Sequence, residues 1–79
     1  MKQKRIKLAT IAEAKEFVLA AGKCDFDIDV FYNRIVIDAK SILGVLSLDL
    51  RQILTVEYAG ENEEFEKFLE QKAVTSTAA

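Results

Sequence analysis

Residues 24–30 alternate strictly between apolar and acidic side chains, and this stretch constrains the fold more than any other part of the chain. Successive side chains of a β-strand point to opposite faces, so one side of this segment is apolar and the other is acidic. The pattern predicts a strand whose sheet packs on the core with one face and meets water with the other. The apolar side consists of Phe26, Ile28 and Val30, and the wet side consists of Asp25, Asp27 and Asp29.

Three further strands are predicted. A second apolar run at residues 34–37 follows a short connection that contains Asn33, which is typical of a β-hairpin. Residues 5–8 alternate between polar and apolar side chains, which indicates a half-buried strand near the start of the chain. Residues 52–58 form the fourth predicted strand, with one apolar face made of Leu54, Val56 and Tyr58.

The first predicted helix has a clear start. Thr10 and Glu13 have the Ser/Thr-x-x-Glu spacing of a capping box, in which a hydroxyl and a carboxylate each accept a hydrogen bond from a free N–H of the first turn. Gly22 is expected to end this helix in the left-handed conformation. Apolar residues at three- and four-residue spacing form its buried stripe: Ile11, Ala14, Phe17, Val18 and Ala21.

Two more helices are predicted after the hairpin. Ser41 is a plausible N-cap of a short helix whose apolar residues are Ile42, Leu43, Val45, Leu46 and Leu48. Gly60 turns the chain, and Asn62 is expected to cap a last helix marked by Phe65, Phe68 and Leu69.

The element order is therefore βαββαβα, which favours an α+β open-faced sandwich. In this fold one four-stranded antiparallel sheet carries three helices on one face. A chain of 79 residues is long enough for one domain, spanning residues 1–79. The small and weakly polar residues 75–79 are expected to be a disordered tail.

Composition excludes several classes of function. The 79 residues contain no histidine, so none of them can carry phosphate, a metal or a proton on an imidazole. A net charge of −2 gives no pull toward nucleic acid or an anionic membrane. No apolar run is long enough to span a membrane, and no signal peptide opens the chain. Cys24 is the single cysteine, is expected to be a small core residue, and points to the reducing cytoplasm.

Enzymatic activity is not expected, because the chain lacks a glycine-rich phosphate loop and a convincing acid–base pair. No cofactor and no metal are predicted. Asp25, Asp27 and Asp29 lie too regularly along one strand to wrap around an ion, so they are interpreted as a solvated face. The basic residues near the start, Lys2, Lys4, Arg5 and Lys7, have no interleaved aromatic side chains and do not predict nucleic-acid binding.

Residues 39–48, with the sequence AKSILGVLSL, resemble the HPr family, the small phosphocarrier proteins of the bacterial sugar phosphotransferase system. They are similar to the regulatory-serine region of the family, a lysine, a serine, two apolar residues, a glycine and a valine. The similarity continues through residues 14–18 and 58–61, and the element order also matches. It covers residues 4–74, nearly the whole chain, and implies the open-faced sandwich that the residue patterns predict.

The chain departs from the family at the phosphate-accepting site. The family has a loop before its first helix with a histidine, a small residue, an arginine and a proline. Here Thr10 falls at or near the place of the histidine, Ala12 near the arginine and Glu13 near the proline, and the loop is several residues shorter. Thr10 is interpreted as an N-cap rather than a replacement acceptor, so phosphocarrier activity is expected to be lost.

Ser41 lies in the retained motif. In the family this serine is phosphorylated by a dedicated kinase, and the phosphoserine form binds a transcription regulator. The resemblance therefore implies that Ser41 is a regulatory phosphosite, with a partner-binding surface formed by Lys40, Ile42, Leu43 and Val45.

A plainer interpretation is that Ser41 only caps the helix and that its apolar neighbours belong to the core. Two functions follow. The first is an interaction or regulatory module whose protein partner is a serine kinase or a transcription regulator. The alternative is a structural or homo-oligomeric module with no phosphotransferase role, and a homodimer is compatible with either.

Overall fold

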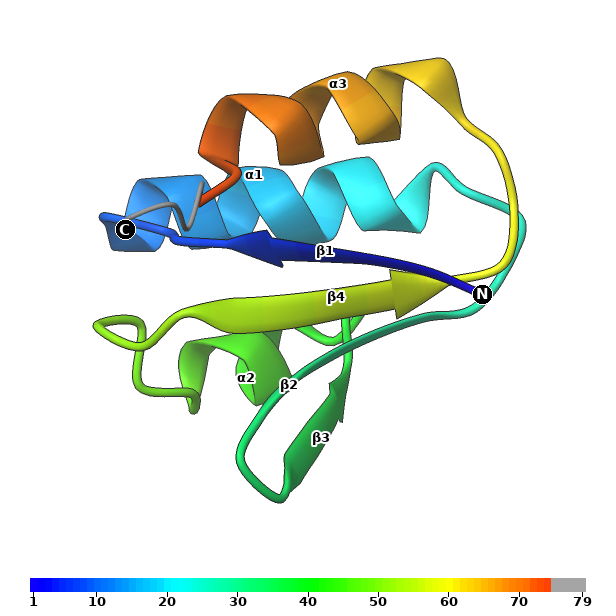
Figure 1. Ribbon diagram of the computed structural model, residues 1–79. Coiled ribbons are helices and arrows are strands. Elements are labelled where there is room, and N and C mark those ends of the chain that lie inside the picture. The colour runs from blue at the N-terminus through cyan, green and yellow to red at the C-terminus, as the bar shows by residue number, and fades with distance from the viewer. Residues whose placement is uncertain (75–79) are drawn as a thin grey trace.

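The computed structural model describes residues 1–74, and the predicted tail at residues 75–79 lies outside the described part. Its elements follow the predicted order (Figure 1). They are β1 (Lys2–Ile6), α1 (Ile11–Gly22), β2 (Ile28–Tyr32), β3 (Ile35–Asp38), α2 (Ile42–Leu46), β4 (Leu54–Tyr58) and α3 (Glu63–Lys72).

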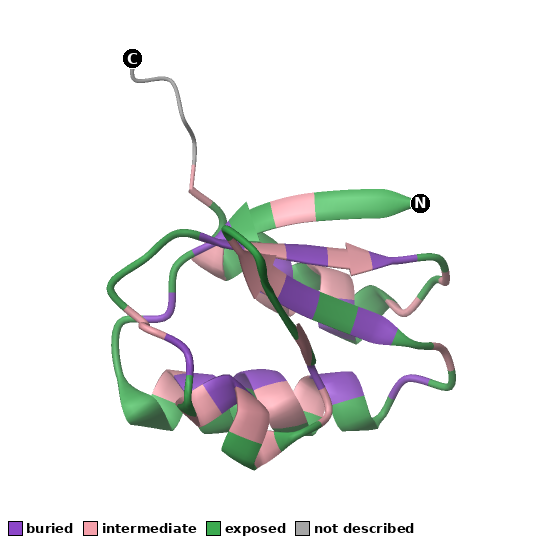
Figure 2. Cartoon of the chain, turned by 90° about the horizontal axis from the view of Figure 1, so that it is seen from below, coloured by how far each residue is buried: buried purple, intermediate pink, exposed green. Residues whose placement is uncertain are grey.

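The strands form one antiparallel sheet in the order β1-β4-β2-β3. Strand β4, the last to be reached along the chain, is therefore central and pairs with both β1 and β2. The helices lie together on one side of the sheet, and the other side stays open (Figure 2). The predicted fold class, an α+β open-faced sandwich, is confirmed.

The core lies between the sheet and the helices. Leu54, Val56 and Tyr58 of β4 are buried, as the alternation of that strand predicts. Above them the Phe17 and Phe65 rings have centroids 6.2 Å apart, and Tyr58 meets Phe65 edge-on at 5.5 Å. Each such large side chain contributes about 1.5–3 kcal/mol of burial free energy, so this aromatic cluster holds α1 and α3 on the sheet.

The strands predicted at residues 34–37 and 52–58 are shifted or shortened by one or two residues, and those predicted at residues 5–8 and 24–30 differ more. Strand β1 begins at Lys2 and ends at Ile6, because the backbone N–H of Lys7 donates to Lys72 at the end of α3 instead of to β4. Strand β2 begins only at Ile28, since residues 24–27 have no neighbouring strand to pair with.

The acidic face predicted for β2 is therefore smaller than expected. Asp25 and Asp27 lie in the segment before the strand, and Asp29 alone belongs to β2. Phe26, predicted to point inward from a strand, is half-buried and packs against the backbone at Gly60, where a Cβ atom would collide with its ring.

The turns also differ in detail from the prediction. Helix α1 continues through Gly22, and the N–H of Lys23 donates to the carbonyls of both Ala20 and Ala21. Gly22 is not left-handed, so the predicted glycine cap is wrong. Asn33 instead has the positive φ of 55°, at the first position of the two-residue turn between β2 and β3. A positive φ there fits the twist of a hairpin.

None of the helices among residues 1–74 combines the length and the hydrophobicity that crossing a membrane requires.

Candidate functional site

The start of α1 is a closed capping box. Thr10 has an extended backbone, and its Oγ1 accepts a hydrogen bond from the Glu13 backbone N–H at 3.1 Å. In return, Oε1 of Glu13 accepts from the backbone N–H of Ala9 at 2.8 Å. The predicted hydroxyl cap is confirmed, whereas the Glu13 carboxylate bonds the N–H of Ala9, one residue before the cap residue. The Thr10 hydroxyl oxygen already serves as an acceptor in this arrangement.

Glu13 places a negative charge at this helix start. Its carboxylate also lies 3.4 Å from the ammonium of Lys72, at the far end of α3. The hydrogen bond from Ala9, followed by the interaction with Lys72, lowers the pKa of the Glu13 carboxyl below its ordinary value. A helix N-terminus favours an anion, and here the chain supplies one itself. A phosphoryl group near Thr10 would meet this carboxylate.

The start of α2 uses the same hydroxyl chemistry in a more open setting. Ser41 is exposed, and its Oγ accepts from the Gly44 backbone N–H at 3.1 Å. The Ser41 carbonyl begins the helical bonding by accepting from Val45 at 2.9 Å. The predicted N-cap is confirmed. The third helical position is Gly44, which has no side chain. The start of α2 therefore lacks a carboxylate like that of Glu13, which accepts a hydrogen bond from Ala9 at the start of α1.

Gly44 allows α2 to pack closely. A Cβ atom at this position would lie 2.6 Å from Cγ2 of Ile37 in β3 and 3.1 Å from Oγ of Ser41. A carbon atom cannot approach another at 2.6 Å without displacing it. The missing side chain thus brings α2 against β3 and leaves room for the capping hydroxyl.

The ammonium and the backbone N–H of Lys40 both donate hydrogen bonds within the chain. Its ammonium donates to the backbone carbonyl of Cys24 at 3.0 Å, and its backbone N–H donates to Oδ1 of Asp38 at 2.9 Å. The Cys24 thiol is buried at 4% exposure, and burial raises its pKa, which suppresses the reactive thiolate. The sequence-based interpretation of Cys24 as a core residue agrees with this placement.

The apolar residues after Ser41 divide between the core and the surface. Val45 is fully buried, so it is unavailable for the partner contact that the family resemblance implied; the plainer core interpretation is the correct one for this residue. Ile42 is half-buried, whereas Leu43 is 80% exposed. The predicted contact surface is thereby reduced to Ile42 and Leu43, with the tethered Lys40 beside them.

Helix α1 adds residues to this surface that the sequence patterns did not indicate. A hollow of about 360 Å³ between α1 and α2 is lined by Lys15, Val18, Leu19 and Ile42. Leu19 is 68% exposed and lies outside the buried stripe of α1, and an isolated leucine on the polar side of a helix was the signal that could have revealed it. We call Lys15, Val18, Leu19, Ile42 and Leu43 together the α1–α2 patch.

Comparisons with known proteins agree with this architecture. The family described as "PTS HPr component phosphorylation site" matches residues 11–73, a range that begins directly after Thr10 and includes Ser41. Comparison with curated proteins gives no match.

Two solved structures are similar over nearly their whole length. The crystal structure of HPr-C-His from Thermoanaerobacter tengcongensis is 29% identical with a TM-score of 0.73, covering 90% of this chain and 89% of that one. A phosphocarrier protein HPr from Bacillus anthracis str. Ames is 27% identical with a TM-score of 0.64, covering 91% of this chain and 92% of that one.

Proposed function

This chain belongs to the HPr family, and on that premise we propose that it is a regulatory or interaction protein that has lost phosphoryl transfer and is controlled through Ser41. HPr proteins are phosphocarriers that act with protein partners and are not enzymes in the usual sense. In this function the chain retains the family fold and still binds protein partners. It is regulated by phosphorylation and does not pass phosphate on.

The loss of the carrier function is supported by the start of α1. Phosphoryl transfer requires a nucleophile whose phosphorylated form gives the phosphate up again, and no histidine is present. A phosphate ester on Thr10 would be far too stable to hand its phosphate on. The Thr10 hydroxyl is also engaged in the capping box, and the Glu13 carboxylate would repel an incoming phosphoryl donor.

The observation that carries the proposal is the exposed Ser41 hydroxyl at the start of α2, two residues before the exposed Leu43 side chain. A kinase would join Ser41 Oγ to the γ-phosphorus of ATP, take up the hydroxyl proton and release ADP. The product adds a charge of about −1.5 to −2 at the start of α2. A negative charge is favoured at a helix start, so the modification can create a new surface without unfolding α2.

The partner expected for the modified protein combines cations with an apolar contact. Arginine side chains would bind the phosphate, and an apolar surface would cover Leu43 and the rest of the α1–α2 patch. A transcription regulator is the partner class that the family resemblance implies. Action as a single domain in the cytoplasm, with Cys24 as a free buried thiol, is part of the same proposal.

The first experiment treats the chain with an HPr serine kinase and ATP and locates the product by mass spectrometry. We expect one phosphate, on Ser41, and none in Ser41→Ala. Ser47→Ala is the matched control, because Ser47 is also an exposed serine and lies at the other end of α2; it should be modified as wild type is. An unmodified wild-type chain beside a phosphorylated control HPr would remove the regulatory function and leave the structural alternative.

A second experiment examines the surface. The phosphorylated chain should bind the regulator, and the unmodified chain should not. Leu43→Ala, in the phosphorylated form, is expected to weaken binding about tenfold, because it removes an exposed apolar contact without touching the core. Equal binding of the modified and unmodified forms would show that Ser41 is not the control point.

The carrier function is tested separately with phosphoenolpyruvate and the general phosphotransferase enzyme that charges HPr. No phosphorylated species is expected for this chain under conditions that charge a control HPr. Detection of a phosphorylated chain would contradict the loss of phosphoryl transfer while leaving the Ser41 experiment unaffected.

A further inference from the structure

The open face of the sheet carries a row of carboxylates. In the register of the sheet, Asp29 of β2 lies directly opposite Asp38 of β3 on one side and Glu57 of β4 on the other. All three belong to the face that the helices leave uncovered, since their strand neighbours Ile28, Val30 and Val56 are buried on the helix side. We call Asp29, Asp38 and Glu57 the acidic row.

The acidic row is not neutralised within the described chain. Glu57 accepts a hydrogen bond from the Gln3 side chain at 2.7 Å, and Asp38 accepts from the backbone N–H of Lys40. Among residues 1–74, no ion pair includes any of the three carboxylates. Like charges directly opposite one another destabilise a sheet, so a partner that brings cations to this row would relieve a repulsion present in the single chain.

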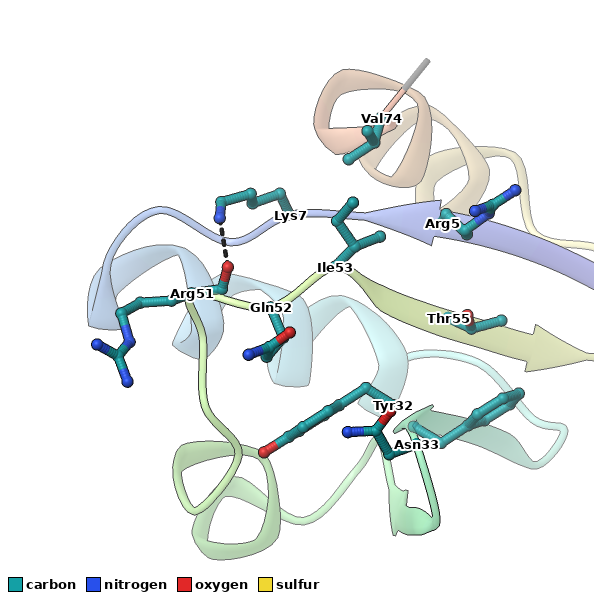
Figure 3. Close-up of a pocket in the computed structure, with 10 residues that line it drawn as sticks. Arg5, Lys7, Tyr32, Asn33, Arg51, Gln52, Ile53, Thr55 and Val74 are labelled. Atoms are coloured by element: carbon teal, nitrogen blue, oxygen red, sulfur yellow. Dashed lines mark hydrogen bonds between the residues drawn. The ribbon is translucent and has the colours of Figure 1, made fainter. Parts of the chain in front are cut away.

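The same face carries cations near the end of β1 and the start of β4. Arg5, Lys7 and Arg51 line a surface hollow of about 560 Å³ (Figure 3). The Lys7 ammonium donates to the backbone carbonyl of Arg51, and the Arg51 guanidinium pairs with Asp49 at 3.0 Å. Arg5 and Lys7 have no carboxylate partner within the described residues. We call Arg5, Lys7 and Arg51 the basic end.

Apolar side chains lie between these two charged regions. Phe31 is half-buried and pairs in register with Thr55 on one side and with Val36, 61% exposed, on the other. Ile53, 44% exposed, lines the hollow together with Phe31. An apolar centre with charges at the margin is the usual composition of a protein interface.

We infer that the open sheet face is a self-association surface and that its occupant is a second copy of this chain. Two copies can stack their open faces on each other about a two-fold axis that runs parallel to both faces. If this axis is perpendicular to the line from the acidic row to the basic end, it places the acidic row of one copy over the basic end of the other. Each acidic row then meets the basic end of the partner, and the apolar centres meet each other. Such an interface uses the same patch on both subunits.

Another occupant fits less well. An acidic protein or a nucleic acid would be attracted to the basic end but repelled by the acidic row of the same face. A basic partner would have the opposite difficulty. Only a partner with a positive region opposite the acidic row and a negative region opposite the basic end is complementary to the whole face. A second copy of this chain has such a surface.

The expected dimer is weak. Four strands spaced about 4.8 Å apart, each four or five residues long, make a face of roughly 20 by 17 Å. Two such faces have a projected area on the order of 700 Å², which is below the range of standard-size interfaces and is expected of a transient contact. Its charged margins are exposed, so salt should weaken it. The surface is on the other side of the sheet from Ser41, so failure of this inference would leave the proposed function intact.

The test is a charge swap read out by sedimentation equilibrium at low salt. Wild type should dimerise as its concentration rises. The basic-reversed variant (Arg5→Glu, Lys7→Glu) and the acid-reversed variant (Asp29→Lys, Glu57→Lys) should each self-associate at least about tenfold more weakly. Mixed together, the two should restore association, because each reversed residue again faces a region in which the opposite charge predominates.

A control variant separates the loss of specific pairing in the acid-reversed variant from an effect of its net charge. Glu16→Lys with Glu64→Lys has the same net charge as the acid-reversed variant, but its substitutions lie on the exposed sides of α1 and α3. Alone, it should self-associate as wild type does, because its substitutions leave the open sheet face unchanged. Circular dichroism melts of all variants verify that they fold.

Three results would overturn the inference. Wild type could stay monomeric at the highest concentration measured, both reversed variants could associate as wild type does, or the control variant could lose association as the acid-reversed variant does. The second result would place any dimer on another face, such as the α1–α2 patch.

Discussion

Helices α1 and α2 begin with the same hydrogen bond and differ in what surrounds it. The hydroxyl oxygens of Thr10 and Ser41 each accept a hydrogen bond from the backbone N–H three residues further on, with an N to O distance of 3.1 Å in both cases. At α1 that third residue is Glu13, whose carboxylate reaches back to Ala9, whereas at α2 it is Gly44. The residue at the third helical position therefore decides whether a capping hydroxyl is closed off by an anion or left beside an open surface.

This contrast shows that the α1 site differs from the family pattern by more than one side chain. If only the histidine were missing, restoring it would restore the acceptor. The Glu13 carboxylate and its link to Lys72 instead make the helix start a structural joint between α1 and α3. The α2 start keeps an uncharged, exposed hydroxyl and the glycine that positions it.

The largest expected effect is all-or-none and concerns α1. Thr10→His should remain unphosphorylated by phosphoenolpyruvate and the general phosphotransferase enzyme, because Glu13 still repels phosphate and Ala12 falls near the place of the family's arginine. Mass spectrometry compares it with the phosphocarrier protein HPr from Bacillus anthracis. Phosphate on the introduced imidazole would show that the joint is no obstacle and would break the contrast between the two helix starts.

The next effect concerns the packing of α2. Gly44→Ala should lower the free energy of unfolding by about 1–2 kcal/mol, because its Cβ would displace Ile37 and crowd the Ser41 hydroxyl. Gly22→Ala is the matched control: it is also helical, its Cβ meets nothing within 4 Å, and it should stabilise by up to about 1 kcal/mol. Urea titration measures both. Equal responses would mean that α2 does not depend on close approach.

A smaller effect is expected from the α1 cap. Thr10→Ala should cost about 1 kcal/mol of unfolding free energy, the usual value for a lost N-cap hydroxyl, and Thr10→Ser should be nearly neutral. Coincident urea midpoints for wild type and Thr10→Ala would show that the capping box contributes nothing and that Glu13 alone orders this helix start.

The smallest effect is a dependence on pH. Because the pKa of Glu13 is lowered in the folded chain, its ionised form stabilises the fold above the ordinary value of 4.5, and this stabilisation is lost as the pH falls through the folded value. The stability difference between wild type and Glu13→Gln should therefore shrink on acidification from about pH 7 to about pH 3. A difference that stays constant over this range would contradict the carboxylate's role. The start of α2 has no such pH-dependent stabilisation, because Gly44 stands where α1 has Glu13.

Local features of the fold were predictable from the sequence. The Thr10–Glu13 capping box and the Ser41 cap were predicted from their spacing, and so was Asn62, whose Oδ1 accepts from Phe65 at 3.0 Å. Each depends on residues within one helical turn. Alternation placed the three buried residues of β4 for the same reason: a strand's two faces are fixed by its own residues once it is paired on both sides.

Features that depend on distant partners were not predictable. Alternation continues through residues 7 and 8 and through residues 24–27, yet neither stretch is a strand, because no strand lies alongside to bond with it. The sequence also could not divide the apolar residues after Ser41 into buried Val45 and exposed Leu43. That division is set by how α2 rests on β3, which Gly44 permits and the local pattern does not specify.

The central position of β4 has a consequence for how the chain acquires its structure. Gln3 and Glu57 are neighbours in the sheet although 54 positions separate them, and β2 also needs β4 as its second neighbour. Closing so long a loop has an entropic cost that only the finished pairing offsets, which slows folding. A chain emerging from the ribosome can form α1 and the β2–β3 hairpin early, but its sheet must wait until Tyr58 has been synthesised.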